Sequence, residues 1–148
     1  MSAGAPESPK LSTTFDQTLG FEVGEIGDEL VTGSFPVADA VRQPFGIVHG
    51  GAYAGMAEML ASVATYVNVQ ADGQIAVGLS NDTNFLRPVS EGTVRAEGRR
   101  RHRGRTTWIW DVEFRDERDR VCALSRVTIA VRPAPAGRPP ARAGGSGS

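Results

Sequence analysis

The chain has 148 residues, 40% of them hydrophobic and 22% charged, as in one globular domain with enough sequence to build a core. No apolar run approaches a membrane span, the N-terminus lacks a signal-peptide pattern, and a single cysteine, Cys122, excludes an intrachain disulfide. We therefore expect a cytoplasmic protein that does not bind membranes. The net charge of −1 hides an asymmetry, because residues 1–86 hold ten acidic and two basic residues, whereas residues 87–148 hold seven and fourteen. The fourteen are all arginines, which favour bidentate contact with phosphate or carboxylate.

The first third of the sequence predicts an arm, two strands and a loop. Residues 1–16 begin with a stretch rich in serine, alanine, glycine and proline, so we expect a flexible N-terminal arm, with a short helix over residues 13–19. Residues 21–26 and 29–37 have the composition of two strands joined by a tight Gly-Asp turn. Residues 38–48 form a loop that leads into the next element.

A small and apolar stretch without proline predicts one long helix from Gly50 to about residue 68. Gly50 and Gly51 occupy its first turn, where free N–H groups point outward at the positive end of the helix dipole. Glu58 is the only charged residue of this helix. We expect protein to surround so apolar a helix, so the lone carboxylate faces a partner, a cavity or a ligand.

Four more strands are predicted, over residues 74–89, 93–101, 106–115 and 119–131, with a hairpin tip at 103–105. Antiparallel strands around one long helix define an α+β fold, and the open edges of such a sheet favour self-association. Alternation places six residues of the first of these four strands on one face. They are Ile75, Val77, Leu79, Asn81, Thr83 and Phe85.

The C-terminal residues 134–148 are rich in proline, alanine and glycine, which predicts a disordered tail. The folded domain is therefore expected over residues 17–133.

Two motifs carry a family likeness: HGGAY at residues 49–53 with AEMLA at residues 57–61, and WIWDV at residues 108–112. Together they resemble the hot-dog thioesterases that hydrolyse acyl-coenzyme A (acyl-CoA), in the branch called PaaI-like. Within that branch the pattern is most similar to the Arthrobacter-type 4-hydroxybenzoyl-CoA thioesterases. Further segments that resemble the family have the family's spacing from about residue 17 to residue 133, without an obvious insertion. The resemblance implies a hot-dog fold, in which an antiparallel sheet wraps around a long central helix.

The resemblance also implies the catalytic roles. Glu58 would act on the thioester as the nucleophile or as the general base for water, and the Gly50 N–H would polarise the thioester carbonyl. Gln43 matches a glutamine that contacts the reacting group. Ser62 stands where the relatives have threonine, one helical turn beyond Glu58, and its hydroxyl can still hold a water molecule.

A second group of residues is implied in binding the substrate and its CoA nucleotide. Arg87 and Thr106 match positions that contact the nucleotide, and Arg105 replaces a small hydroxyl residue beside them. His49 is placed at the same site, although a histidine there is also typical of a helix cap. With only two histidines in the chain a metal site is not expected, and no cofactor is required beyond the CoA of the substrate.

Less specific interpretations remain open at this stage. Glu58 could pair with a buried arginine, and Trp108 and Trp110 fit core or subunit contacts. The arginine-rich residues 99–105 invite a nucleic-acid interpretation, but the run is short and acidic strands flank it. These arginines fit better as contacts for the CoA phosphates or as a solvated hairpin, so no nucleic-acid partner is expected.

The leading hypothesis is an acyl-CoA thioesterase for an aromatic acyl group, similar to 4-hydroxybenzoyl-CoA. Phenylacetyl-, dihydroxynaphthoyl- and medium-chain acyl-CoA are alternative substrates. A non-catalytic hot-dog module that binds acyl-CoA is an alternative of another class. We expect a homotetramer built from two dimers, with active sites at the dimer interface.

Overall fold

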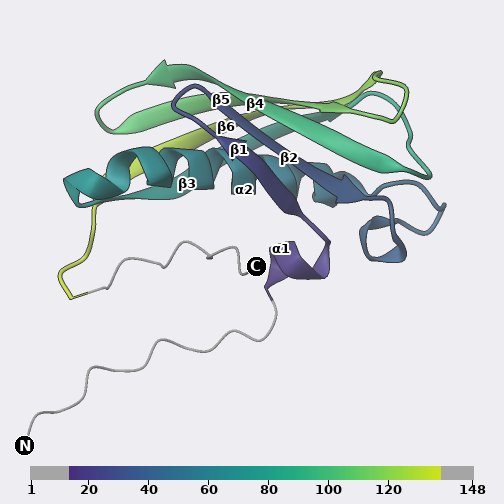
Figure 1. Cartoon of the computed structure of the whole chain (residues 1–148), viewed down its shortest axis with the longest axis horizontal. Coiled ribbons are helices and arrows are strands. Elements are labelled where there is room, and N and C mark those ends of the chain that lie inside the picture. Colours follow the sequence, from purple (N-terminus) through teal and green to yellow (C-terminus); the bar gives the residue numbers. More distant parts are fainter. Residues whose placement is uncertain (1–13, 138–148) are drawn as a thin grey trace, which may run out of the picture.

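The computed structural model describes residues 14–137, and Figure 1 shows how their elements are arranged. A curved antiparallel sheet lies over one long helix, so the predicted hot-dog fold is confirmed. The expected arm over residues 1–16 and tail over residues 134–148 lie mostly outside the described residues. The helices are α1 (Phe15–Thr18), η1 (Asp39–Val41), α2 (Gly50–Val69) and η2 (Gln70–Asp72), and the strands are β1 (Glu22–Ile26), β2 (Leu30–Pro36), β3 (Gln74–Phe85), β4 (Thr93–Arg103), β5 (Thr107–Arg115) and β6 (Val121–Pro133).

The helix α2 begins and ends close to the predicted limits, because local signals set both ends. His49 is the N-cap, and a turn of 3-10 helix closed by Gly73, with φ of +69°, follows its C-terminus. The buried side of α2 packs on the sheet, and the Thr65 hydroxyl accepts a hydrogen bond from Trp110 Nε1 at 3.0 Å. Trp108 and Trp110 are both buried, which confirms their place in the core.

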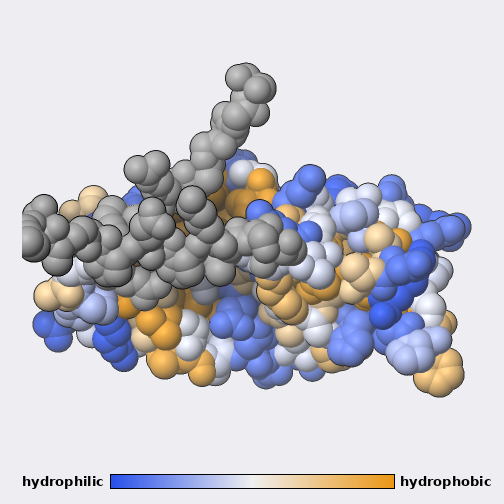
Figure 2. Space-filling view, turned by 90° about the horizontal axis from the view of Figure 1, so that it is seen from below, coloured by the Kyte–Doolittle hydropathy of each residue, from blue (hydrophilic) through white to orange (hydrophobic). Residues whose placement is uncertain are grey.

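Within residues 14–137, part of the opposite side of α2 is left exposed, whereas the sequence predicts that protein surrounds the helix. Glu58 is exposed and Ser62 is half-buried. On the side of the molecule that faces away from most of the sheet, apolar residues gather in patches among polar ones (Figure 2). Exposed apolar residues of the chain include Phe15, Val67, Phe85 and Leu86.

The six strands follow the order β1-β2-β4-β5-β6-β3, with every neighbouring pair antiparallel. The two edges are therefore β1, which is short and irregular, and β3, which has 12 residues. Among the described residues, β3 is paired on one side only, with β6, so a long row of backbone groups faces outward along its free edge.

The predicted alternation along β3 is wrong because the strand contains a bulge. Gly78 pairs with Ile129 and Ser80 pairs with Thr128, so Leu79 is an extra residue without a partner in β6. One inserted residue reverses the side on which every later side chain lies. Residues 81, 83 and 85 therefore share the α2 side of the sheet, whereas 75 and 77 lie on the other face.

Candidate active site

His49 caps the first turn of α2 and fixes its position by hydrogen bonds. The ring Nδ1 of His49 accepts the Gly51 N–H at 2.8 Å, and the backbone N–H of His49 donates to the Val41 carbonyl at 2.7 Å. Since Nδ1 is an acceptor, the neutral ring carries its proton on Nε2. Among residues 14–137 no acceptor faces the Gly50 N–H, which lies at the positive end of the helix dipole. This end of α2 can therefore stabilise a developing negative charge.

A cleft of about 600 Å³ lies against this helix end. Gln43 is turned toward it by the loop, since its carbonyl accepts the Gly46 N–H at 2.9 Å and its side-chain oxygen accepts the Phe45 N–H. The amide NH2 of Gln43 remains as a donor. We call this region the α2 N-terminal cleft. Its lining residues are Gln43, Ile47, Val48, His49, Gly50, Gly51, Tyr53, Phe85, Leu86, Arg87 and Pro88.

Aromatic rings form one wall of the α2 N-terminal cleft. The Phe85 ring approaches Gly50 so closely that a Cβ added at Gly50 would be 2.6 Å from Cζ, which explains why glycine stands there. Tyr53 packs edge-on against Phe114, with ring centroids 5.2 Å apart, and its buried hydroxyl has no hydrogen-bond partner among the described residues. Burial raises the pKa of the Tyr53 hydroxyl and of the neighbouring Cys122 thiol, so both are neutral at pH 7.

Glu58 lies on a different surface, over the backbone of β3. A Cβ added at Gly78 would be 2.7 Å from Glu58 Oε1, so the missing side chain of this glycine makes room for the carboxylate. The described residues offer the carboxylate no hydrogen bond and no ion pair, and the buried arginine partner considered from the sequence is not present. We call Glu58, Ser62 and Gly78 the Glu58 surface.

The two parts of the predicted site are not adjacent within one chain. Gly50 and Glu58 are eight residues apart in α2, which separates them by about 12 Å along the helix axis. A thioester carbonyl cannot touch the Gly50 N–H and the Glu58 carboxylate of the same chain. The sequence places both residues on one helix, and the structure assigns them to two regions.

The expected nucleotide contacts are also divided. Arg87 lies at the α2 N-terminal cleft, where its backbone N–H donates to the Cys122 carbonyl at 3.2 Å. Thr106 lies at the β4–β5 hairpin next to Arg105, and its carbonyl accepts the Val131 N–H at 2.9 Å. Val131 pairs with residue 76, whereas residue 85 lies nine positions further along β3, or about 30 Å away. Within one chain, Arg87 and the β4–β5 hairpin are at opposite ends of the sheet.

Most arginines of residues 99–105 have acidic partners. Arg100 and Arg103 both contact Asp28, at 2.7 and 3.0 Å, and Arg101 contacts Asp111 at 2.8 Å. Arg100, and more weakly Arg103, lower the pKa of the Asp28 carboxyl group, whereas Arg126 and then Arg101 lower the pKa of the Asp111 carboxyl group. The ion pairs of residues 99–105 therefore link neighbouring segments of the sheet, and these arginines do not form a continuous basic patch for nucleic acid.

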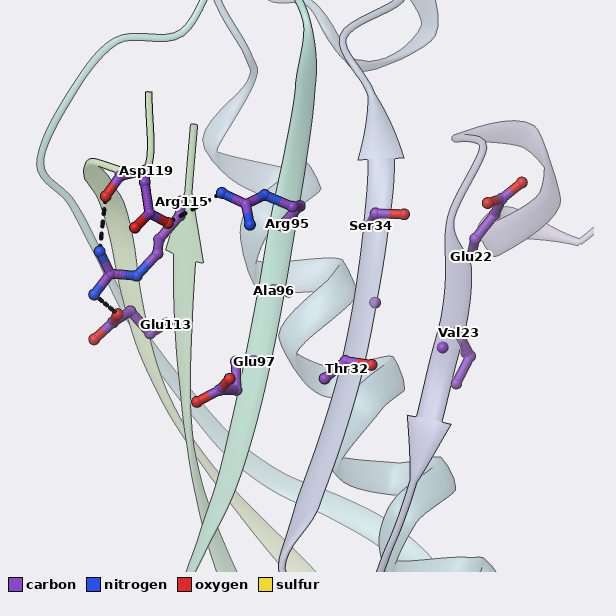
Figure 3. Close-up of a pocket in the computed structure, with 12 residues that line it drawn as sticks. Glu22, Val23, Thr32, Ser34, Arg95, Ala96, Glu97, Glu113, Arg115 and Asp119 are labelled. Atoms are coloured by element: carbon purple, nitrogen blue, oxygen red, sulfur yellow. Dashed lines mark hydrogen bonds and ion pairs between the residues drawn. The ribbon is translucent and has the colours of Figure 1, made fainter. Parts of the chain in front are cut away.

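Another hollow lies on β1, β2, β4 and β5, with α2 behind the strands in the view of Figure 3. Its floor is made of small strand residues such as Gly33, Ser34 and Ala96. Its two arginines are already paired, Arg95 with Asp119 at 3.0 Å and Arg115 with Glu113. None of the sequence-predicted site residues lines this hollow, so it is not the candidate active site.

Two kinds of feature are absent from residues 14–137. No group of three or more His, Cys, Asp or Glu residues in this part of the chain could hold a metal ion. None of its helices has the length and apolarity that a membrane crossing requires.

Comparison with known proteins supports the fold and the class of reaction. Residues 45–123 match the thioesterase superfamily. A proofreading thioesterase, EntH, of Cronobacter turicensis is 40% identical over 118 residues, which cover 80% of this chain and 85% of EntH. A thioesterase of Pseudomonas aeruginosa, crystallised as a variant with one glutamine replaced by alanine, has a TM-score of 0.79 and 34% identity over 86% of this chain and 97% of its own.

A thioesterase of Staphylococcus aureus has a TM-score of 0.78 and 30% identity, over 82% of this chain and 100% of its own. Its structures include one variant with a glutamine replaced by alanine and one with a glutamate replaced by alanine. The chain described here belongs to the hot-dog thioesterase superfamily and is a thioester hydrolase.

Proposed function

We propose that the chain hydrolyses the thioester bond of an aromatic acyl-CoA of the 4-hydroxybenzoyl type. One observation carries this proposal: an unpaired carboxylate lies over a glycine, on the same helix as an N-terminal N–H that has no acceptor. The first supplies the attacking oxygen, directly or through water, and the second stabilises the oxyanion. Collapse of that intermediate breaks the carbon–sulfur bond and releases CoA. If water attacks, the free acid forms in the same step; if the carboxylate attacks, a Glu58 anhydride forms and water then hydrolyses it to the free acid.

We propose that two protomers complete each site, because 12 Å separates the two groups in one chain. The free edge of β3 suits antiparallel pairing with the same strand of a second copy around a two-fold axis. Gly78 lies under Glu58 and Phe85 lies against Gly50, so a register that pairs Gly78 with the partner subunit's Phe85 brings the two parts together. The axis then passes between Asn81 and Asp82.

The same register also reunites the nucleotide contacts. Pairing Gly78 with the partner's Phe85 aligns Ala76 with the partner's Arg87, and Ala76 lies at the level of the β4–β5 hairpin. Arg105 and Thr106 of one protomer then share an end of the combined sheet with the partner's Arg87. Two such dimers would form the expected homotetramer.

The relatives support the choice of residues. The glutamine and the glutamate replaced in the Staphylococcus aureus thioesterase are fifteen positions apart, as are Gln43 and Glu58. In our proposal the Gln43 amide NH2 and the Gly50 N–H face the thioester of a substrate in the α2 N-terminal cleft. Ser62 holds the water that a general-base mechanism requires.

The aromatic wall supports an aromatic acyl group, since the exposed Phe85 ring, packed on the buried Tyr53, offers a surface for stacking. Rates with 4-hydroxybenzoyl-, phenylacetyl-, dihydroxynaphthoyl- and hexanoyl-CoA would rank the acyl groups. A higher kcat/KM for hexanoyl-CoA than for every aromatic substrate would contradict the aromatic assignment.

The decisive variant is Glu58→Gln, which keeps the shape of the side chain and removes its basic oxygen. We expect kcat to fall at least ~10²-fold with KM within a few-fold, because the nucleotide is bound elsewhere. Single turnover in ¹⁸O-water places label in Glu58 if it is the nucleophile and only in the acid if it is the base. A Glu58→Gln enzyme with normal kcat, or a wild-type protein that binds acyl-CoA without hydrolysis, would contradict the proposal.

A further inference from the structure

A polar network joins β3 to α2 midway between the two parts of the site. Asn81 Nδ2 donates to the Ala54 carbonyl at 2.8 Å, and Thr83 Oγ1 donates to Asn81 Oδ1 at 2.7 Å. Thr83 Oγ1 is also 2.8 Å from Ser125 Oγ, and Ser125 is buried. Since the one hydroxyl proton of Thr83 goes to Asn81, the Ser125 hydroxyl donates to Thr83.

The network has only one possible direction. The Ala54 carbonyl can only accept, so the amide of Asn81 must turn its NH2 toward the helix. Its oxygen then faces Thr83, which is held by Ser125 from the neighbouring strand β6. Three side chains on two strands thus fix the orientation of one amide.

The acceptor of this bond belongs to the helical turn that carries the proposed catalytic carboxylate. In an α-helix the Ala54 carbonyl already accepts the backbone N–H of Glu58. Asn81 therefore binds the turn of residues 54–58 directly to β3, the same strand on which Glu58 lies against Gly78. No other side-chain hydrogen bond between β3 and α2 occurs within residues 14–137.

We infer that Asn81 is a positioning residue for the reaction, which holds the Glu58 turn of α2 at a fixed distance from β3, with Thr83 and Ser125 orienting its amide. This inference rests on the proposed function of Glu58. Among residues 14–137 the carboxylate has no hydrogen bond or ion pair to fix it, so its place relative to a bound thioester depends on the position of the helix. A displacement near 1 Å is enough to reduce a reaction rate by about two orders of magnitude.

The chain offers a matched control. Asn68 Nδ2 donates to the Ala64 carbonyl of the same helix at 2.7 Å and to the Gly27 carbonyl at 3.2 Å. Asn68→Ala therefore removes the same kind of bond from α2, ten residues beyond Glu58. A general loss of helix stability affects both variants, whereas a loss of position affects only Asn81→Ala.

The experiment compares Asn81→Ala, Asn68→Ala and Glu58→Gln by Tm, steady-state kinetics and amide hydrogen exchange. Asn81→Ala is expected to lower kcat about 10- to 100-fold with KM within about threefold. It should also speed exchange of the Glu58 amide, whereas Asn68→Ala changes kcat less than twofold at a similar Tm. If Asn81→Ala does not fold, Thr83→Val should show a smaller loss of kcat, whereas Thr83→Ser, which keeps the hydroxyl, should have a kcat close to that of the wild type.

Normal kcat in Asn81→Ala, or losses in both asparagine variants that follow Tm alone, would overturn the inference. Those results leave the proposed function intact as long as Glu58→Gln is inactive. A fully active Glu58→Gln would instead remove the proposed function itself.

Discussion

The α2 N-terminal cleft and the Glu58 surface lie on one helix but differ in how they are supported. In the cleft, His49 and Gln43 are fixed by hydrogen bonds of their own chain, and Phe85 and Tyr53 supply a wall. On the Glu58 surface the carboxylate has space above Gly78 and no partner within the described part of the chain. In our proposal one protomer thus preorganises the oxyanion-binding half of the site, whereas the attacking half is complete only when a partner subunit faces it.

That difference is understandable from the energetics of charge. N–H donors at a helix end can be held in place without a ligand, because their neighbours are neutral and the dipole is part of the backbone. A carboxylate paired with an arginine would lose basicity and nucleophilic character. An active site therefore gains from a Glu58 without an ionic partner, at the expense of a defined position, which other contacts must provide.

The largest expected effect comes from mixing two inactive variants. If each site takes Glu58 from one protomer and Gln43 from the other, a mixed dimer of Glu58→Gln and Gln43→Ala has one intact site. Refolding the two variants together in equal amounts should then restore about a quarter of wild-type activity, since half the dimers are mixed. Activity no higher than the average of the separate variants would show that Gln43 and Glu58 act within one chain.

A change under the carboxylate tests the Glu58 surface alone. Gly78→Ala would place a methyl group 2.7 Å from Glu58 Oε1, and the flexible carboxylate would move away. We expect kcat to fall about tenfold with little change in Tm, because only the end of a side chain is displaced. Gly24→Ala is the control, since its methyl group would be 2.6 Å from Thr32 Oγ1 at the other edge of the sheet. An equal loss of kcat in both variants would contradict a special role for Gly78.

The nucleotide contacts should affect binding more than chemistry. Arg87→Ala and Arg105→Ala are each expected to raise KM for acyl-CoA about five- to tenfold with kcat nearly unchanged. The defect should disappear with a short thioester that lacks the nucleotide. Arg99→Ala, which breaks only a surface pair with Glu97 at 2.7 Å, is the control. Loss of kcat on the short thioester would instead place these arginines near the reacting bond.

Sequence reasoning predicted the elements better than their relation in space. The helix and the sheet follow from composition, caps and turns, which act locally, so α2 was predicted to within a residue or two. The prediction that six β3 side chains share one face is wrong, because the bulge at Leu79 depends on pairing with β6 and cannot be recognised from the alternation of residues in the sequence. For the same reason the sequence predicts only that Asn81 shares a face with Ile75 and Val77, and it does not indicate the contact of Asn81 with α2.

The sequence predicts the candidate site as a set of residues and not as an arrangement, and the roles of these residues stay predictions. Glu58 and Gly50 are chosen from the lone charge, the glycine pair and the family resemblance. Their separation of about 12 Å follows from helix geometry and could have been calculated from the sequence. The role of Gly78 and the buried hydroxyl of Tyr53 depend on contacts between distant segments, which no local pattern shows.

The smallest expected effect is on stability and concerns the support behind the α2 N-terminal cleft. Asp116 is buried at the β5–β6 turn, where it accepts the N–H groups of Arg120 and Arg118 at 3.0 Å each and the Arg120 guanidinium at 2.9 Å. The Arg120 backbone N–H, then its guanidinium, then the Arg118 N–H lower the pKa of the Asp116 carboxyl below its usual 3.8. The turn packs beside residues 88–92, the loop that follows Arg87 at the cleft.

A lowered folded-state pKa means that ionised Asp116 stabilises the fold above pH 3.8, and that this contribution is lost as pH falls through the lower folded value. Asp116→Asn should therefore have a lower Tm than the wild type at pH 7, and the two Tm values should converge as the pH falls below 3.8. Thermal unfolding followed by circular dichroism across this range measures the gap. If the cleft is supported by its own chain, the gap is independent of protein concentration, whereas a gap that grows on dilution would show that the partner subunit supports this region too.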